Sequence, residues 1–396
     1  MDLRSGWWSL ALLVGCARAG SAQLGTGDPG SDADTDVDAD TDSDTDADTD
    51  ADTDTDVTDT GDSTVPSPPR IFDAAHVLVI PTNDGIALMA NDGTIVHGWS
   101  WNAMVGDCGG CTGEGSSADD VGLLVSWAGM GQNQGIARID ETGAVDFVVT
   151  GMQFPHEAIR DPADQSILVP EAFSNNVNWY AGDGSSDAPV RTLNGAHPDW
   201  SQNLPNGAER VDYDGRAYLL LSNRGSGAPN FGRITFWDIT DPSAIEFVWS
   251  YPRSGTLDTP HGPVFRQFDG QWYLLYAHSY GAPDGGAVGV AVTSDPTLLP
   301  DYVADLVPEA PVGPFDFLRG VELTEDGWLW MTDSGPEFGF GEGRVMSALF
   351  PTGLVPDGSV GNEDDQTFVP LPNVTVVLGG LDNPFEGWLW LPTIVY

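Results

Sequence analysis

A repeat of about 50 residues constrains the fold of this chain most strongly. Its clearest marker is a turn aspartate that recurs at Asp164, Asp214, Asp269 and Asp326, at spacings of 50, 55 and 57 residues. Each copy predicts a short strand, a hairpin turn, a strongly apolar strand and two further strands, and no long segment has the 3.6-residue period of a helix. Four-stranded units of this length predict an all-β β-propeller, because radial closure leaves only short, protected strand edges.

Two weaker copies precede these four, with turns near Asp120 and Asp73. We therefore expect six blades. A seventh stays open, because residues 386–390 (EGWLW) resemble another turn. The alternative for this C-terminal segment is that it closes the ring onto the N-terminal strands.

The N-terminus is typical of an export signal. Arg4 precedes an apolar run, Trp7 to Gly15, which is shorter than the roughly 20 residues that span a bilayer. The run ends in Leu13-Val14-Gly15-Cys16, which resembles a bacterial lipobox and implies cleavage before Cys16 and lipidation of its thiol. We expect an exported lipoprotein at the outer membrane or cell surface, held to the membrane by a lipid anchor only. The alternative is ordinary cleavage after Ala19 or Ala22, which gives a soluble periplasmic or secreted protein.

An acidic tract follows the signal. From Asp32 to Asp56, aspartate alternates with Thr, Ala, Ser or Val, so like charges repel and nothing apolar is available for burial. We expect a signal peptide over residues 1–15, a disordered linker over 16–69 and the propeller over 70–396. The tract lacks the turn glycine and distal glutamate of a calcium loop, so it predicts no metal site.

The charge of the chain excludes some functions. It has 60 acidic and 14 basic residues and a formal net charge of −46, and it contains no lysine. Phosphate neutralisation needs clustered cations, so we expect no nucleic-acid partner. Schiff-base lysine chemistry is excluded as well.

Aligned copies of the repeat place polar side chains at equivalent positions. The first strand of four units opens with a polar residue or pair: His156, Asn206, His261 and Leu318-Arg319. In the copy with its turn at Asp120, the equivalent position is Cys111-Thr112. The first strand of a propeller blade lines the central channel, so we expect these side chains to converge there, in a default ligand site. The alternative is that they serve packing, since histidine can bond neighbouring backbone.

Four segments together resemble the arylsulfotransferase family. Residues 86–99 (IALMANDGTIVHGW) resemble its opening blade, and the others are Phe154-Pro155-His156-Glu157, Ser222-Asn223-Arg224 and Thr259-Pro260-His261-Gly262, in the family's order. The resemblance implies transfer of a sulfuryl group from a small aromatic sulfate donor to a phenolic acceptor, without cofactor or metal. It implies that His261 accepts the group and that His156 and Arg224 assist catalysis.

One departure from the family pattern concerns a further histidine, whose position is taken here by Asn206. His197, in the preceding loop, is a candidate substitute. Arg319 is a candidate second cation at the same rim, and His278 is a candidate supporting residue because it follows an inner strand. We therefore expect Asn206, Arg319, His197 and His278 to bind substrate.

The two cysteines of Cys108-Gly109-Gly110-Cys111 predict a disulfide, because the chain is exported and the glycines allow a tight closure. Zinc or redox sites need further ligands or a helix start, and neither is apparent.

Two other functions remain open at this stage. One is a non-catalytic surface propeller that binds a glycan or a protein. The other is a metal-dependent, lactonase-like hydrolase, for which Glu157, Glu209 and Glu322 lie near the inner strands.

Overall fold

The computed structural model describes residues 77–395, with gaps at 83–84, 107–110, 120–121, 129–133, 141, 201–203, 226–230, 254, 256, 258, 283–284, 335–342, 357–366 and 379–392. The predicted export signal, Cys16 and the acidic linker lie outside these residues and stay predictions. No helix in the described part is long and apolar enough to cross a membrane.

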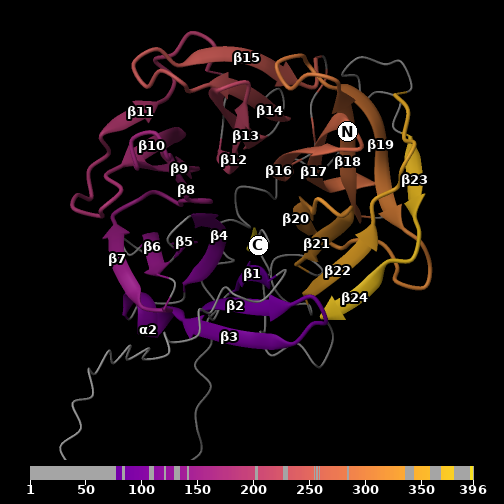
Figure 1. Ribbon diagram of the computed structural model, residues 1–396, viewed down its shortest axis with the longest axis horizontal. Coiled ribbons are helices and arrows are strands. Elements are labelled where there is room, and N and C mark those ends of the chain that lie inside the picture. Colours follow the sequence, from indigo (N-terminus) through magenta and orange to yellow (C-terminus); the bar gives the residue numbers. More distant parts are fainter. Residues whose placement is uncertain are drawn as a thin grey trace, which may run out of the picture.

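Six sheets surround a common centre as blades, which confirms the predicted six-bladed β-propeller (Figure 1). Within each blade, four neighbouring strands pair antiparallel. Blade 1 contains β25 (Thr393–Val395), β1 (Val77–Pro81), β2 (Gly85–Ala90) and β3 (Ile95–Ser100). Blade 2 contains β4 (Thr112–Asp119), β5 (Gly122–Ala128), β6 (Gly135–Asp140) and β7 (Val145–Thr150). Blade 3 contains β8 (Ile159–Arg160), β9 (Ile167–Glu171), β10 (Asn176–Tyr180) and β11 (Arg191–Leu193).

The second half of the ring has the longer strands. Blade 4 contains β12 (Pro205–Tyr213), β13 (Arg216–Gly225), β14 (Phe231–Asp238) and β15 (Glu246–Tyr251). Blade 5 contains β16 (Pro260–Phe268), β17 (Gln271–Ala282), β18 (Gly285–Thr293) and β19 (Asp301–Pro308), with β23 (Phe368–Leu371) added in parallel at its outer edge. Blade 6 contains β20 (Leu318–Leu323), β21 (Trp328–Asp333), β22 (Arg344–Leu349) and β24 (Thr375–Leu378). One short helix, α2 (Trp101–Val105), follows β3.

The C-terminal strand closes the ring. β25 pairs antiparallel with β1, with Val395 opposite Val77 and Thr393 opposite Val79. It therefore supplies the inner strand of blade 1, while β1 to β3 supply the outer three. This confirms closure of the ring by the C-terminal segment as the alternative to a seventh blade.

The predicted Asp-Gly hairpin turns are present where the repeat is clearest. Asp214 and Gly215 have φ angles of 50° and 73°, and Asp269 and Gly270 have 49° and 76°. Two successive positive φ angles define the tight turn whose twist matches that of the flanking strands. This turn fixes the register between the inner strand and the second strand of blades 4 and 5.

Hydrophobic burial holds neighbouring blades together. Among the described residues, each of six hydrophobic clusters joins two adjacent blades. Alternation along a strand produces this arrangement: on β17, Leu274 packs toward blade 4 and Leu275 toward blade 6. Both faces of a blade are buried, which explains why the second strands are almost continuously apolar.

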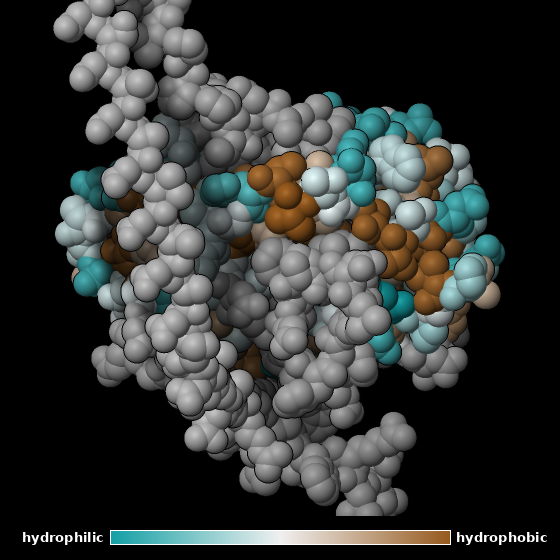
Figure 2. All heavy atoms as spheres, turned by 90° about the horizontal axis from the view of Figure 1, so that it is seen from below, coloured by the Kyte–Doolittle hydropathy of each residue, from teal (hydrophilic) through white to brown (hydrophobic). Residues whose placement is uncertain are grey.

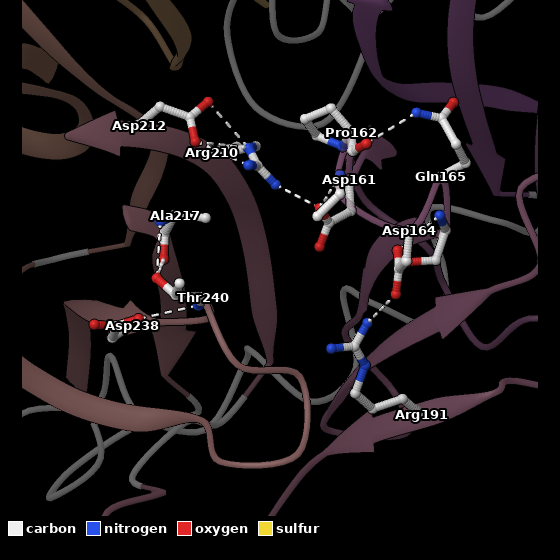
Figure 3. Close-up of polar contacts among 12 residues, drawn as sticks. Asp161, Pro162, Asp164, Gln165, Arg191, Arg210, Asp212, Ala217, Asp238 and Thr240 are labelled. Carbon is white, nitrogen blue, oxygen red and sulfur yellow. Dashed lines mark hydrogen bonds and ion pairs between the residues drawn. The ribbon is translucent and has the colours of Figure 1, made fainter. Parts of the chain in front are cut away.

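Ion pairs add to these contacts between blades 3 and 4. Arg210 Nη1 on β12 lies 2.6 Å from Asp161 Oδ1, and its Nη2 lies 2.8 Å from Asp212 Oδ1 (Figure 3). Arg191 on β11 pairs at 3.0 Å with Asp164, which links the outer strand of blade 3 to its inner hairpin (Figure 3).

Exposed hydrophobic residues are spread over several blades. Val96 on β3, Trp328 on β21 and Val376 on β24 are examples. The side of the molecule in Figure 2 accordingly shows hydrophobic and hydrophilic groups interleaved. The polar residues aligned by the repeat lie elsewhere, where the inner strands begin.

Candidate functional site

The same backbone conformation opens the inner edge of blades 3, 4 and 5. In each, a residue with left-handed φ precedes a proline, and a polar residue follows: Phe154, Leu204 and Thr259 have φ of 57°, 60° and 56°, before Pro155-His156, Pro205-Asn206 and Pro260-His261. Proline fixes its own φ and donates no backbone hydrogen bond. Three blades thus deliver their polar side chain to equivalent positions, as the aligned repeat predicts.

A β-bulge then marks the polar residue in four blades. The register of the inner strand shifts around Glu114, Asn206, Arg319 and the segment after His261. A bulge leaves a residue out of the ladder and redirects its side chain. Glu114 is therefore the blade 2 equivalent of His261 and Arg319.

The assignment of Cys111-Thr112 to this position was wrong. Counting back eight residues from Asp120 arrives at Thr112, but the bulge of β4 at Glu114 lies only six residues before Asp120, whereas Asn206 lies eight residues before Asp214. The shorter hairpin moves the equivalent position to Glu114. A signal for it was present, since the polar residue precedes glycine in Glu114-Gly115, Asn206-Gly207, His261-Gly262 and Arg319-Gly320.

Carboxylates at the ends of two second strands hold the entry loops in place. Glu171 on β9 accepts a hydrogen bond from the Gln153 backbone N–H at 2.9 Å. Asp333 on β21 accepts from the N–H groups of Asp316 and Phe317 at 3.0 and 2.7 Å. These bonds fix the backbone two or three residues before His156 and Arg319, and so orient those side chains.

His261 has a defined tautomer. Its Nδ1 lies 3.0 Å from the Thr259 carbonyl oxygen and 2.9 Å from Ser279 Oγ. A carbonyl only accepts, and the Ser279 hydroxyl donates to the Leu318 carbonyl at 2.7 Å, so both neighbours accept from Nδ1. The proton is therefore on Nδ1, and the basic lone pair is on Nε2.

His156 faces a buried carboxylate. Its Nδ1 lies 3.7 Å from Glu114 Oε2, and the two side chains are 5% and 1% exposed. The other carboxylate oxygen, Glu114 Oε1, accepts from Thr112 Oγ1 at 2.8 Å. The His156 backbone N–H donates to the Pro170 carbonyl at 2.9 Å, which ties this residue to β9.

Two arginines complete the group. The Arg319 guanidinium lies 4.3 Å over the ring of Phe317, and the residue is only 3% exposed. Arg224, near the end of β13, is half-buried, and its backbone N–H donates to the Leu204 carbonyl at 3.0 Å. Arg224 thus stands beside the left-handed residue that leads to Asn206.

These side chains act on one another electrostatically. Burial, and after it the Arg319 and Arg224 guanidinium groups, lower the pKa of His156 to about 3. Burial, the same two arginines and His156 lower the pKa of His261 well below its usual value. Both imidazoles are therefore neutral at pH 7. Hereafter the axial cluster means Glu114, His156, Arg224, His261 and Arg319.

The same arginines act on Glu114. Burial raises the pKa of its carboxyl group to about 8, although the Thr112 hydroxyl and the Arg319 and Arg224 guanidinium groups act to lower it. Two fixed positive charges facing one carboxyl leave the axial cluster positive overall, within a strongly acidic protein. Such a site favours an oxyanion, and the guanidinium fork suits its tetrahedral oxygens.

Asn206 adds a hydrogen-bond donor beside the cluster. It is 1% exposed, and its Oδ1 accepts from Ser222 Oγ at 2.9 Å. Its Nδ2 is buried and has no hydrogen-bond partner among the described residues. A buried amide N–H₂ of this kind is costly unless a ligand or water accepts from it.

Two predicted substrate-binding residues do not join the axial cluster. His197 Nε2 lies 3.2 Å from the Ile245 carbonyl, and its ring lies 5.1 Å from Trp237, so it packs between the outer parts of blades 3 and 4. His278 is buried on β17, where its Nδ1 lies 3.8 Å from Asp305 Oδ1 of β19. Neighbouring residues of a strand face opposite sides, so His278 faces away from the side on which Ser279 meets His261.

The three glutamates considered as metal ligands serve contacts between blades. Glu157 accepts from the Ala208 N–H and Glu209 from the Phe265 N–H, the latter at 2.6 Å. Arg266 Nε donates to Glu322 at 2.9 Å, and Arg266 also pairs with Glu209. Among the residues that the structure describes, no group of three or more His, Cys, Asp or Glu could hold a metal ion.

The cysteines lie apart from this chemistry. Cys111 is buried directly before β4. Cys108 and Cys16 lie outside the described residues, so the disulfide and the lipid attachment stay predictions.

Comparison with known proteins does not assign the chain to a family. No family model matches the chain, and no curated protein matches it. Similar solved structures include a protein of unknown function from Bacteroides caccae, with a TM-score of 0.47, 12% identity and coverage of 81% of this chain and 99% of that one. Another is the periplasmic gluconolactonase PpgL of Pseudomonas aeruginosa, with a TM-score of 0.45, 12% identity and the same coverages. These likenesses assign no activity to the chain.

Proposed function

We propose that this propeller is an arylsulfotransferase-like enzyme, which moves a sulfuryl group from an aryl sulfate to a phenol through a sulfohistidine. The observation that supports it most is the state of His261. Its proton is held on Nδ1 by Thr259 and Ser279, which leaves the Nε2 lone pair as a nucleophile, within a group that contains two arginines. The motif resemblance around His156, Arg224 and His261 points to the same chemistry.

In the first half-reaction, His261 Nε2 attacks the sulfur of the donor. An N–S bond forms, the S–O bond to the aryl group breaks, and the aryl oxide leaves with the bonding electron pair. The ring becomes positive, and Nδ1–H then donates more strongly to the Thr259 carbonyl at 3.0 Å. Arg224 and Arg319 stabilise the negative sulfuryl oxygens, a role for which loss of one donor typically costs roughly 3 kcal/mol of barrier.

In the second half-reaction, the acceptor hydroxyl oxygen attacks the same sulfur. An O–S bond forms, the acceptor O–H bond breaks and its proton passes to solvent, and the N–S bond breaks with its electron pair returning to Nε2. Donor and acceptor use one site in turn, so the kinetics are ping-pong. No cofactor enters either step.

Steady-state assays with 4-nitrophenyl sulfate and phenol test the proposal. We expect release of nitrophenolate that depends on phenol, with parallel lines in double-reciprocal plots. His261→Asn should abolish it, whereas His97→Asn, at an exposed position on β3, should leave it unchanged. Turnover that survives in His261→Asn would contradict the assignment.

A non-catalytic propeller that binds an anionic glycan or protein is the second candidate. Asn206 favours it, because the family pattern has a histidine at this position. This function predicts that sulfate esters bind without turnover. Measuring equilibrium binding of 4-nitrobenzenesulfonate together with the assay above separates the two functions.

We also propose that the protein is exported and attached by a lipid on Cys16, on the strength of the N-terminal sequence. Metabolic labelling with a palmitate analogue tests this. Label that is absent in wild type, or retained in Cys16→Ala, contradicts the anchor.

A further inference from the structure

We propose that the stacked rings of Phe154 and Phe173 form an aromatic platform at the mouth of the axial cluster, which selects substrates whose aromatic part is longer than one ring. This rests on the proposed function, because it takes the sulfuryl group to bind at the two arginines. It adds the residues that hold the aryl group and the length of aryl group that they favour. Phe173 lies outside the motifs that suggested the function.

The two rings lead outward from the cluster. The Phe154 ring lies edge-on to the His156 imidazole, with 5.2 Å between the ring centroids. The Phe173 ring stacks on Phe154, with 4.7 Å between centroids and 28° between planes. Phe154 is half-buried, whereas Phe173 is 50% exposed. The order from the cluster to solvent is therefore the imidazole, a covered ring and an open ring.

The open ring lies at the rim where the inner strands begin. Phe173 is in the β9–β10 loop (residues 172–175), and β9 runs antiparallel to β8, so this loop lies at the entry to the inner strand. Of the exposed large hydrophobic residues in the described part of the chain, Phe173 alone lies in a loop between the second and third strands of a blade. A single exposed hydrophobic side chain needs no explanation, but this one continues an aromatic stack that begins at the cluster.

Hydrogen bonds fix the platform before a ligand binds. The Ala172 N–H donates to the Phe154 carbonyl at 3.0 Å, and the Phe173 N–H donates to the Gln153 carbonyl at 3.2 Å. Glu171 accepts from the Gln153 N–H at 2.9 Å. The loop that bears Phe173 is thus tied to the segment that bears Phe154. A preorganised aromatic surface loses little conformational freedom on binding, which favours affinity.

The equivalent positions of blades 4 to 6 supply no second platform. Leu204 and Thr259 take the place of Phe154 in blades 4 and 5. Phe317 is the equivalent in blade 6, but it is 3% exposed and the Arg319 guanidinium lies 4.3 Å over its ring. Among these four positions, an aryl group therefore finds an open aromatic surface on the blade 3 side only.

The place of Phe173 in the stack sets the length of substrate that reaches it. The arginines that bind the sulfuryl group act directly on His156, so the first ring of a substrate meets Phe154 beside that imidazole. The Phe154 ring separates Phe173 from the imidazole, so a second ring is needed to contact Phe173. One aromatic contact typically changes affinity about 2- to 10-fold.

Equilibrium binding of two sulfonates, measured by calorimetry, tests the platform. Sulfonates resemble sulfate esters, but their C–S bond is not broken by transfer. Biphenyl-4-sulfonate has two rings and benzenesulfonate has one. In Phe173→Ala we expect the Kd of biphenyl-4-sulfonate to rise about 5-fold and that of benzenesulfonate to change less than about 2-fold. Phe154→Leu should weaken both, and leucine suits the backbone there because Leu204 has the same left-handed conformation in blade 4.

Two variants serve as controls. Phe173→Tyr keeps the ring and should bind both sulfonates as wild type does. Phe368→Ala removes a phenylalanine that is 37% exposed on β23, at the outer edge of blade 5, and should leave both affinities unchanged.

The outcomes separate the platform from the proposed function. Equal affinity of wild type and Phe173→Ala for biphenyl-4-sulfonate, or no binding of it to wild type, would overturn the platform. An equal loss for both sulfonates would overturn selection by length. If Phe173→Ala loses biphenyl-4-sulfonate as expected but wild type releases no nitrophenolate from 4-nitrophenyl sulfate, sulfuryl transfer is overturned and the platform stands as a binding site.

Discussion

Mild acid should destabilise this protein through His156, and replacement of this residue should remove that effect. Burial of the imidazole, and after it the charge of two guanidinium groups, lowers its pKa to about 3. In the unfolded chain the same group titrates near its ordinary value, about 6.5. Below pH 6.5 the unfolded state therefore binds a proton that the folded state excludes, and the free energy of unfolding decreases as the pH falls from 6.5 toward 3.

The size of the effect follows from linkage. Each pH unit in this window costs about 1.4 kcal/mol, so His156 alone lowers the free energy of unfolding by about 2 kcal/mol between pH 7.5 and pH 5.0. Buried glutamates act in the opposite direction, because burial raises the pKa of Glu114 and of Glu157 to about 8 and also raises that of Glu322. The pH dependence of wild type alone is therefore not diagnostic, whereas its difference from that of His156→Asn is.

Urea unfolding monitored by tryptophan fluorescence at the two pH values gives this difference. We expect His156→Asn to lose about 2 kcal/mol less than wild type on acidification. Phe154→Leu is the matched control, since it changes packing 5.2 Å from the imidazole but keeps the imidazole itself, and should behave as wild type. Equal losses in wild type and His156→Asn would refute a buried, neutral His156 in a positive cluster.

Three further variants test other parts of the account. Ser279→Ala removes a partner of His261 Nδ1 and the donor to Leu318, and should cost about 1–3 kcal/mol in urea unfolding while lowering sulfuryl transfer. Gly207→Ala would place a Cβ 2.7 Å from Ser222 Oγ and 3.0 Å from the Gly262 nitrogen, and should lower stability by about 1–3 kcal/mol, measured as a lower Tm. Truncation before Thr393 removes the inner strand of blade 1, and should replace one cooperative thermal transition with a broad one at lower temperature. For each of the three variants, unfolding that is the same as in wild type contradicts the contact concerned.

The fold was predictable because each copy of the repeat consists of strand-forming segments separated by turn-forming residues. Asp214-Gly215 and Asp269-Gly270 can adopt the two positive φ angles that a tight hairpin needs, and few other pairs do so without strain. The path of the chain in blade 6 was not predictable. There β23 leaves to pair with β19 of blade 5 before β24 completes the sheet, and this exchange depends on packing between blades.

The positions of the polar residues at the strand entries were predictable where local geometry repeats. His156, Asn206 and His261 follow the same left-handed residue and proline, so one alignment located all three. Glu114 was missed because its hairpin is shorter. His278 was misplaced because the residue type does not indicate which side of a strand it faces, and His197 because it lies in the loop between β11 and β12, whose path the repeat does not determine. The side chain direction depends on bulges and register, which only coordinates show.

Rapid-quench mass spectrometry tests the central claim most directly. The protein is mixed with 4-nitrophenyl sulfate without acceptor, quenched in base, digested, and the peptide that contains His261 is analysed. The account predicts a sulfuryl adduct on His261 that disappears when phenol is added before the quench. An adduct on another residue, or none while nitrophenolate is released in a burst, would contradict the account.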